Sequence, residues 1–393
     1  MLPSLRHDLD IMPSPVPDRP GILIRDPMRY SDAVLIIPYA FGTALKCFDG
    51  QHSELDLRAV GDTRLQLLDA LRESGFLDDE VFAELRRRRE GEFARAAVRE
   101  PAHAGSGYPV EPKALEETMR GYIDRAQLHG SLATLAIAAP HVSPFGGWQS
   151  YQAAYKSLPP DAENRTFVIL GTSHYGPVDK FGLTRKPFLT PLGATRPNIE
   201  LIERLSARAG DAINEEDYCH SVEHSIEFQV LFLQWIYGPG ISIVPILCGC
   251  FARSIYLGGK PEDNDGVNRF IGELGEIAAR ADGGLTWVLG VDMAHIGRRY
   301  GDEVPAYAHR DHMIEVAERD RARNERVIAG DADGFWELIQ QNRDDLRWCG
   351  SSPFYTFLKA VPGIQGTVER YEQWNIDEAS VVSFAGISFK REQ

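Results

Sequence analysis

The chain has 393 residues, of which 43% are hydrophobic and 25% are charged, a balance typical of a folded globular protein. This length predicts two domains rather than a single core. The formal net charge of -15 argues against sequence-independent binding to nucleic acid or to an acidic membrane. We also find no apolar run long enough to cross a bilayer.

The cysteines and the first residues of the chain indicate the cellular compartment of the protein. The five cysteines are odd in number and show no paired disulfide framework, which fits a reducing cytoplasm. The opening residues MLPSLRHDLD carry charges and lack the apolar core of a signal peptide. We therefore expect a cytoplasmic protein.

The first hundred residues are predicted to form a small α+β module. Short apolar runs between residues 22 and 38 indicate strands, and Asp49-Gly50 indicates a turn before a helix with Ser53 as its N-cap. Helical spacing then continues with a break at Gly75. This pattern suggests a winged-helix-like domain over residues 1–100, followed by a linker that is rich in Gly and Pro.

Strand and helix patterns alternate along residues 101–393. The strand candidates are residues 132–138, 166–172, 241–249, 285–291 and 381–389. The helix candidates are residues 114–127, 151–158, 198–209, 225–237, 266–281 and 352–361. This alternation predicts a three-layer α/β/α domain with a largely parallel sheet and helices on both faces.

Three residues at the ends of short apolar runs stand out: His141, His174 and Cys349. Ligand chemistry in open α/β sheets gathers at the carboxyl ends of strands. Two imidazoles and a thiolate there could hold one transition-metal ion. The alternatives are solvent-exposed loop histidines and a cysteine that is only a small buried hydrophobe. Because Cys349 precedes a predicted helix, we expect its pKa to be lowered.

Two further pairs of polar residues are candidates for the same site. Glu223 and His224 open the helix pattern at 225–237, so Glu223 is either a helix cap or a site residue, and His224 is expected to contact substrate or a metal ligand. Asp292 and His295 follow the strand at 285–291 and share a face if a helical turn begins there. Asp292 would then raise the pKa of His295 for general acid/base work; the alternative is a surface ion pair.

Several common motifs are missing from the sequence. We find no P-loop, no GxGxxG after a strand and no GxSxG elbow. Cys248 and Cys250 are too few for a closed zinc site, and we interpret them as core residues.

From about Gly105 onward the chain resembles the Memo family (AmmeMemoRadiSam system protein B-like). The motifs in common are AGSGYP, PHVSPFGGW, ILGTSHYG, TPLG, EHSIEFQ, GVDMAHIGRRYG and CGSSPF. The family is similar to class III extradiol dioxygenases, which cleave catechol rings with non-haem Fe(II). The resemblance implies metal ligands at His141, His174 and Cys349, with Asp292, His295, Glu223 and His224 around them.

This resemblance also bears on the metal. The dioxygenases use two histidines and one carboxylate, whereas a cysteine in the third place favours iron with an altered potential, copper or zinc. The His141-Val142-Ser143-Pro144 and Val291-Asp292-Met293-Ala294-His295 segments differ from those of relatives at small polar positions, so the substrate is left open.

The N-terminal region resembles PqqD-like winged-helix modules, chiefly through IRDP and CFDGQHSELDL. That resemblance implies a peptide, a radical enzyme or a maturation enzyme as partner, bound along an edge strand. Taken together, the sequence predicts a cytoplasmic oxidoreductase-like enzyme that uses Fe²⁺ or copper, with zinc as a further option, on a small-molecule or peptide substrate. The alternative is a non-catalytic scaffold that binds a peptide or ligand.

Overall fold

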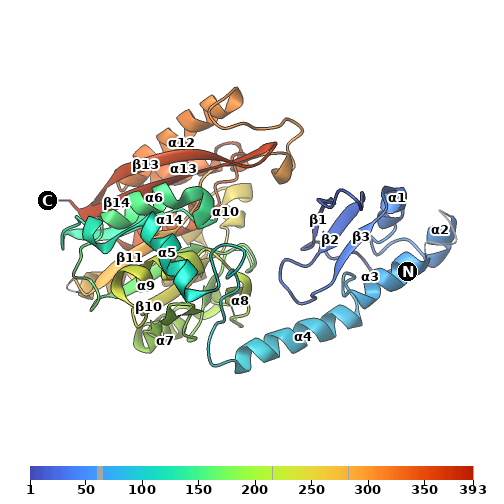
Figure 1. The fold of residues 1–393 in the computed structure, drawn as a ribbon, viewed down its shortest axis with the longest axis horizontal. Helices are drawn as coiled ribbons and strands as arrows, with labels where there is room; N and C mark the ends of the chain where they lie inside the picture. The colour runs from blue at the N-terminus through green and yellow to red at the C-terminus, as the bar shows by residue number, and fades with distance from the viewer. Residues whose placement is uncertain (60–64, 215, 282, 393) are drawn as a thin grey trace. The chain divides into compact units, whose positions relative to one another are not determined.

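A computed structural model describes residues 1–59, 65–214, 216–281 and 283–392 (Figure 1). The chain forms two compact units, Met1–Ala96 and Ala97–Gln393. The division falls just before the stretch 99–112 that we predicted to be a linker, so that stretch belongs to the second unit. Among the described residues, no helix has the length and apolarity needed to span a membrane.

The first unit is a small antiparallel sheet with helices. Its strands are β1 (Asp10–Pro13), β2 (Ile22–Arg25) and β3 (Val34–Ile37), in the order β1-β2-β3. Its helices are α1 (Gly42–Leu45), α2 (Glu54–Ala59), α3 (Leu65–Glu73) and α4 (Glu80–Arg95). Gly50 and Gly75 adopt φ of 77° and 68°, which places glycine at both of the predicted breaks.

The second unit is built on a sheet with the strand order β12-β14-β4-β11-β5-β10-β6. The central strands β4 (Thr134–Ala139), β11 (Leu285–Gly290), β5 (Thr166–Thr172) and β10 (Ser242–Cys248) are parallel to one another. Strand β14 (Ser380–Arg391) pairs antiparallel with β4, with β12 (His295–Gly297) and with β13 (Ile364–Asp377). At the other edge, β6 (Phe181–Leu183) pairs antiparallel with β10, and β9 (Arg196–Pro197) pairs parallel with it.

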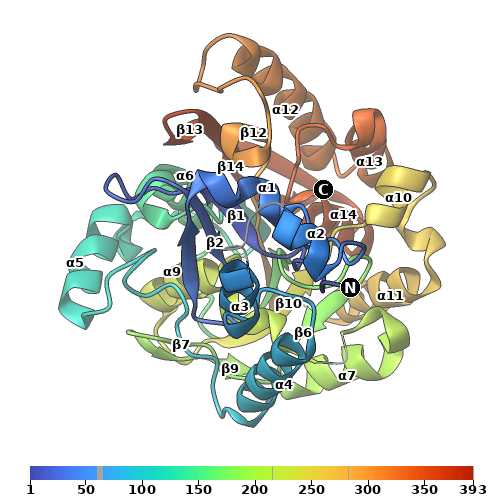
Figure 2. The same cartoon turned by 90° about the vertical axis from the view of Figure 1, so that its right-hand side faces the viewer.

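Helices cover both faces of this sheet, as predicted (Figure 2). One face packs against α5 (Pro112–Tyr122), α6 (Pro144–Lys156) and α9 (Glu227–Tyr237). The other packs against α7 (Ile199–Ala209), α11 (Asp265–Arg280), α12 (His312–Ile328), α13 (Ala332–Gln340) and α14 (Ser351–Ala360). Alternate residues of β4 enter the two cores, Ala136 and Ala138 on one side and Ile137 and Ala139 on the other. The three-layer α/β/α fold is therefore confirmed.

Some elements differ from the sequence prediction. The helix expected over 114–127 ends at Tyr122, and a separate 3-10 turn follows at Arg125–Gln127 because Asp124 caps it. The sequence prediction also omitted β13, which has a mostly exposed, polar face and lies on the outer side of β14. The second unit also contains two short helices, α8 (Cys219–Val222) and α10 (Ala252–Leu257).

Candidate metal centre

Three predicted site residues follow three neighbouring parallel strands. His141 lies two residues after β4, His174 two residues after β5 and Asp292 two residues after β11. Because β11 pairs with β4 on one side and β5 on the other, their carboxyl ends meet at one edge of the sheet. The structure therefore brings these loops together as the sequence predicts.

A cluster of three histidines forms at this edge. One ring nitrogen from each of His141, His174 and His224 lies within 4.8 Å of the other two. The ring centroids are 5.0 Å apart for His141 and His174, 5.1 Å for His141 and His224, and 4.8 Å for the stacked pair His174 and His224. His224, which we expected to contact substrate or a metal ligand, thus lies beside both His141 and His174.

Hydrogen bonds fix which nitrogen of each ring faces the cluster. The Nδ1 of His141 is 2.9 Å from the carbonyl oxygen of Gly290. The Nδ1 atoms of His174 and His224 lie 3.0 Å and 3.2 Å from Oε1 of Glu223. Carbonyl and carboxylate oxygens only accept, so each Nδ1 carries a proton, and each Nε2 has a free lone pair when its ring is neutral. This is the usual arrangement of histidines that ligate a metal. Burial opposes the charged ring of His174, but Glu223 outweighs it and raises the pKa of His174.

Glu223 holds two of these rings and the backbone around them. Its carboxylate is buried and accepts the backbone N–H of His174, His224 and Ser225 at 2.8, 2.9 and 3.1 Å. Burial alone would favour the protonated acid, but the two histidines outweigh it and hold the pKa of Glu223 well below its usual value. Glu223 is therefore not the cap of α9, whose N-cap is Ile226 without a side-chain bond. It binds the backbone of the preceding turn and orients His174 and His224.

Cys349 lies against His141, directly before Gly350 and α14. Its Sγ is 3.3 Å from Nε2 of His141 and donates to the carbonyl oxygen of Asp292 at 3.6 Å. The expected low pKa is wrong: burial, and then the charge of Asp292, raise the pKa of the Cys349 thiol well above its usual value. The N-terminus of α14 stabilises the thiolate of Cys349 less than the loss of water around the sulfur destabilises it.

The expected pairing of Asp292 with His295 is also wrong. No helical turn forms after β11, because the chain runs extended into β12. Asp292 instead accepts the backbone N–H groups of His141 and Val142 at 2.9 and 3.3 Å, and its Oδ2 lies 3.4 Å from Nε2 of His141. Burial raises the pKa of Asp292 to about 7.

His295 has a different environment from the one we expected. Its Nδ1 faces the carbonyl oxygens of Met293 and Arg347 at 2.9 and 3.2 Å, and its ring meets Tyr300 edge to face at 5.0 Å. Burial lowers the pKa of His295 to about 4, the opposite of the predicted direction. The ring is therefore neutral near pH 7, with Nε2 unprotonated.

The segment predicted to be a linker supplies residues that the sequence prediction missed. Arg99 is fully buried, pairs with the buried Glu227, and donates to the carbonyl oxygens of His220 and Glu223 at 2.9 and 2.7 Å. Glu227 also accepts from Tyr108 at 2.5 Å. This network holds the turn that carries Glu223 and His224. The EHSIE run contains Glu227, but nothing in the sequence indicates that an arginine over one hundred residues earlier pairs with it.

His103 comes from the same segment and borders the cluster. Its ring centroid lies 5.5 Å from that of His224, and its Nε2 is 2.8 Å from the carbonyl oxygen of Val222. Burial lowers the pKa of His103. With this ring, four histidines line the carboxyl edge of the sheet.

The donor set fits a transition-metal ion. A tetrahedral ion bound to nitrogen and sulfur holds the two atoms roughly 3.6 Å apart, close to the 3.3 Å between Nε2 of His141 and Sγ of Cys349. Nitrogen ligands on one such ion are roughly 3.4 Å apart, so the three imidazoles need to rotate inward by about an ångström. Imidazole and thiolate ligands suit iron, copper and zinc.

The fold and this edge define an α/β/α protein with a histidine-rich centre at the carboxyl ends of its parallel strands. The family model described as Memo-like protein matches residues 99–388 of this chain. The chain belongs to this family, and the resemblance drawn from its motifs is confirmed.

Relatives share most of the chain. A MEMO1 family protein from Aquifex aeolicus is 24% identical over 385 residues, covering 93% of this chain and 95% of that protein. The MEMO1 family protein TK1477 from Thermococcus kodakarensis is 28% identical over 307 residues, covering 75% and 100%. Among solved structures, the uncharacterized protein JW3007 from Escherichia coli K12 is 14% identical with a TM-score of 0.35, covering 65% of this chain and 99% of that one.

Proposed function

We propose that this protein is a metal-dependent, oxidoreductase-like enzyme whose ion, Fe²⁺ or copper and with zinc as a further option, is bound by His141, His174 and His224. The observation that carries the proposal is that all three rings have their Nδ1 held by an acceptor, while one nitrogen of each ring lies within 4.8 Å of the other two. Cys349 is the proposed fourth ligand, because its Sγ reaches the same nitrogen of His141.

The residues around the ion would orient its ligands and hold a proton. A redox-active ion held by these residues would supply Lewis-acid and electron-transfer chemistry. Glu223 and Asp292 fix His174, His224 and His141 before the ion arrives, which lowers the cost of ordering them. Cys349 holds its proton on sulfur until an ion replaces it, because a ligating thiolate must be deprotonated.

His295 is the proposed proton acceptor. Its Nδ1 proton is engaged by Met293, so its Nε2 lone pair is available to a substrate hydroxyl. Its low pKa keeps the ring neutral, with Nε2 unprotonated, across the neutral pH range. Asp292 contributes by positioning His141 rather than by orienting His295.

The cytoplasm remains the proposed compartment. All five cysteines are unpaired, which suits a reducing environment. The partner proposed for the first unit is a peptide or maturation enzyme.

A non-catalytic scaffold is the competing function, and one observation favours it. The edge strands β1 and β3 have no further strand beside them among the described residues, and each presents an exposed apolar side chain, Ile11 at 48% and Val34 at 58%. Such edges can accept an extended peptide as an added strand. A scaffold would bind its peptide without needing His174 or His295.

Elemental analysis of protein purified without chelator and without air tests the metal. We expect about one iron or copper per chain in the natural protein and in the His129→Ala control, whose histidine is exposed and precedes β4, whereas His141 follows that strand. We expect His174→Ala to lose at least about nine tenths of that metal. A metal content that His174→Ala and His224→Ala both leave unchanged would contradict the proposed site.

Two more variants separate the roles within the site. If Cys349 is a fourth ligand, Cys349→Ser keeps part of the metal and changes its absorption spectrum. If the protein is an enzyme, His295→Ala keeps the metal but abolishes oxygen consumption with a phenolic substrate that the natural protein turns over. Absence of metal at every stage, with the fold intact, would favour the scaffold.

A further inference from the structure

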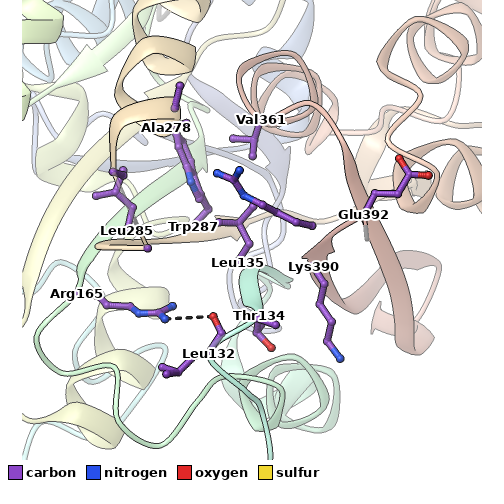
Figure 3. Close-up of a pocket in the computed structure, with 15 residues that line it drawn as sticks. Leu132, Thr134, Leu135, Arg165, Ala278, Leu285, Trp287, Val361, Lys390 and Glu392 are labelled. Carbon is purple, nitrogen blue, oxygen red and sulfur yellow. Dashed lines mark hydrogen bonds between the residues drawn. The ribbon is translucent and has the colours of Figure 1, made fainter.

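A cavity lies at the end of the central sheet that is opposite to the histidine cluster. It has a volume of about 520 Å³ and opens where β4, β5 and β11 begin, near Thr134, Arg165 and Leu285 (Figure 3). The histidine cluster follows the far ends of the same strands. A strand of six or seven residues is roughly 20 Å long, so the two places are separated by the depth of the sheet.

The walls of this cavity differ in character. Apolar side chains, among them Leu285, Trp287 and Val361, line one part of it, and Arg165 and Lys390 lie along another (Figure 3). Among the described residues that line the cavity, three side chains are basic, with Arg391 as the third, and one is acidic, Glu392. In a chain of formal charge -15, a cavity with an excess of positive charge is unusual.

Arg165 enters the cavity with its charge uncompensated. Its guanidinium donates to the hydroxyl of Thr286 and to the carbonyl oxygen of Leu132, both at 3.3 Å. Both acceptors are neutral, and no ion pair of Arg165 occurs among the described residues. A guanidinium has five N–H donors, so several are left for a ligand.

A strand irregularity brings the other two cations to the same cavity. Consecutive residues of a regular strand point to opposite faces, so Lys390 and Arg391 would normally separate. The register between β14 and β4 shifts between Phe389 and Lys390, where Lys390 pairs with Thr134. Such a bulge re-aims side chains, and both residues line the cavity. In the part of the chain that the structure describes, neither forms an ion pair.

We propose that this cavity binds a small organic anion, with a carboxylate or phosphate group on the basic side and an apolar body against the exposed Leu132 and the partly buried Leu135. The volume lies within the range of small-molecule pockets. Arginine binds carboxylate and phosphate oxygens in a bidentate manner, and the leucine side chains suit an apolar body. The site is separate from the histidine cluster and does not depend on a metal.

Calorimetric titration of the full chain with three probes tests this site. The probes are 1-naphthoate, 1-naphthyl phosphate and the neutral 1-naphthamide, which share one apolar body. We expect one or both anions to bind at least about tenfold more tightly than the amide, because only they pair with the cations. The tighter of the two anions identifies the head group that the site prefers.

Variants locate the binding. We expect Arg165→Gln to weaken the preferred anion at least about tenfold, and the double change Lys390→Gln with Arg391→Gln to do the same from the exposed strand end. Arg321→Gln, an exposed arginine of α12 with no ion pair among the described residues, should change the dissociation constant less than about twofold. His174→Ala should leave it unchanged.

Three results would overturn the proposal. One is equal affinity for the amide and both anions. Another is unchanged binding in both the Arg165→Gln and the double variant. The third is loss of binding in His174→Ala, which would place the anion at the histidine cluster instead.

Discussion

The two ends of the central sheet handle charge in opposite ways. At the carboxyl end, Glu223 and Asp292 are buried and have donors from rings and backbone within a few ångströms. At the amino end, Arg165 and Lys390 line an open cavity and form no ion pair among the described residues. The first end is organised before any ligand arrives, whereas the second end leaves its charge for a ligand to neutralise.

This difference predicts how each end responds to mutation. Removing one partner from a buried, fully bonded network leaves the other unpaired, which is costly. Removing an exposed cation that has no partner changes little in the folded protein. The following variants test that contrast from the strongest effect to the weakest.

Arg99→Met should have the largest effect on stability. It leaves the carboxylate of Glu227 buried without its partner, and we expect the free energy of unfolding to fall by about 3–5 kcal/mol. Urea denaturation followed by circular dichroism measures the loss. The double variant Arg99→Met with Glu227→Leu should recover part of it. A loss below about 1 kcal/mol in the single variant would show that the network is not what holds this end together.

Glu223→Gln should weaken metal binding more than it weakens the fold. The amide can accept from only one oxygen, so His174 and His224 lose the carboxylate that orients both rings. We expect the affinity for the metal to fall about 10–100-fold, as for other groups that orient ligands. Competition with a coloured chelator gives the affinity. Glu318→Gln, an exposed carboxyl on α12, is the control and should bind as the natural protein does.

His220→Gln should change how stability depends on pH. Burial lowers the pKa of His220 to about 4 from 6.5, so the unfolded chain takes up a proton between those values and the folded chain does not. Stability therefore falls as the pH drops from 6.5 towards 4, by about 2 kcal/mol at pH 5 from this group. Comparing urea midpoints at pH 7 and pH 5 should show a smaller fall in the variant. An identical fall in both proteins would exclude His220 as the cause.

Lys390→Gln should have the smallest effect on stability. Its side chain is exposed and has no ion pair among the described residues, so we expect a change within about 0.5 kcal/mol. Thermal unfolding followed by circular dichroism is sufficient to measure it. Destabilisation by more than about 1 kcal/mol would mean that the amino end, too, relies on internal partners.

The sequence was sufficient to predict the layers and two histidines of the cluster. Buried parallel strands appear as continuous apolar runs, so residues 166–172 and 285–291 were recognised, and His141 and His174 followed from the rule that strand ends meet. Strand β13 was missed because half of its residues face solvent, and its polar alternation gave no continuous run.

The partners of each site residue could not be predicted from spacing. Asp292 and His295 are three residues apart, but the backbone between them is extended, so Asp292 turns to His141. His224 joins the cluster because Glu223 and Arg99 hold its turn. The contact between Glu223 and His174 spans 49 residues of sequence, and the contact between Glu223 and Arg99 spans 124. The pKa of Cys349 depended on burial, which its place before a helix did not reveal.

X-ray absorption of the ion that co-purifies with the protein tests whether the three histidines bind it. We expect a first shell of nitrogen ligands at roughly 2.0–2.1 Å with the outer signals of imidazole, and at most one sulfur at roughly 2.3 Å. The imidazole signals should decrease in His224→Ala. A shell of oxygen ligands alone, or an imidazole shell that His141→Ala and His174→Ala leave unchanged, would contradict the proposed centre.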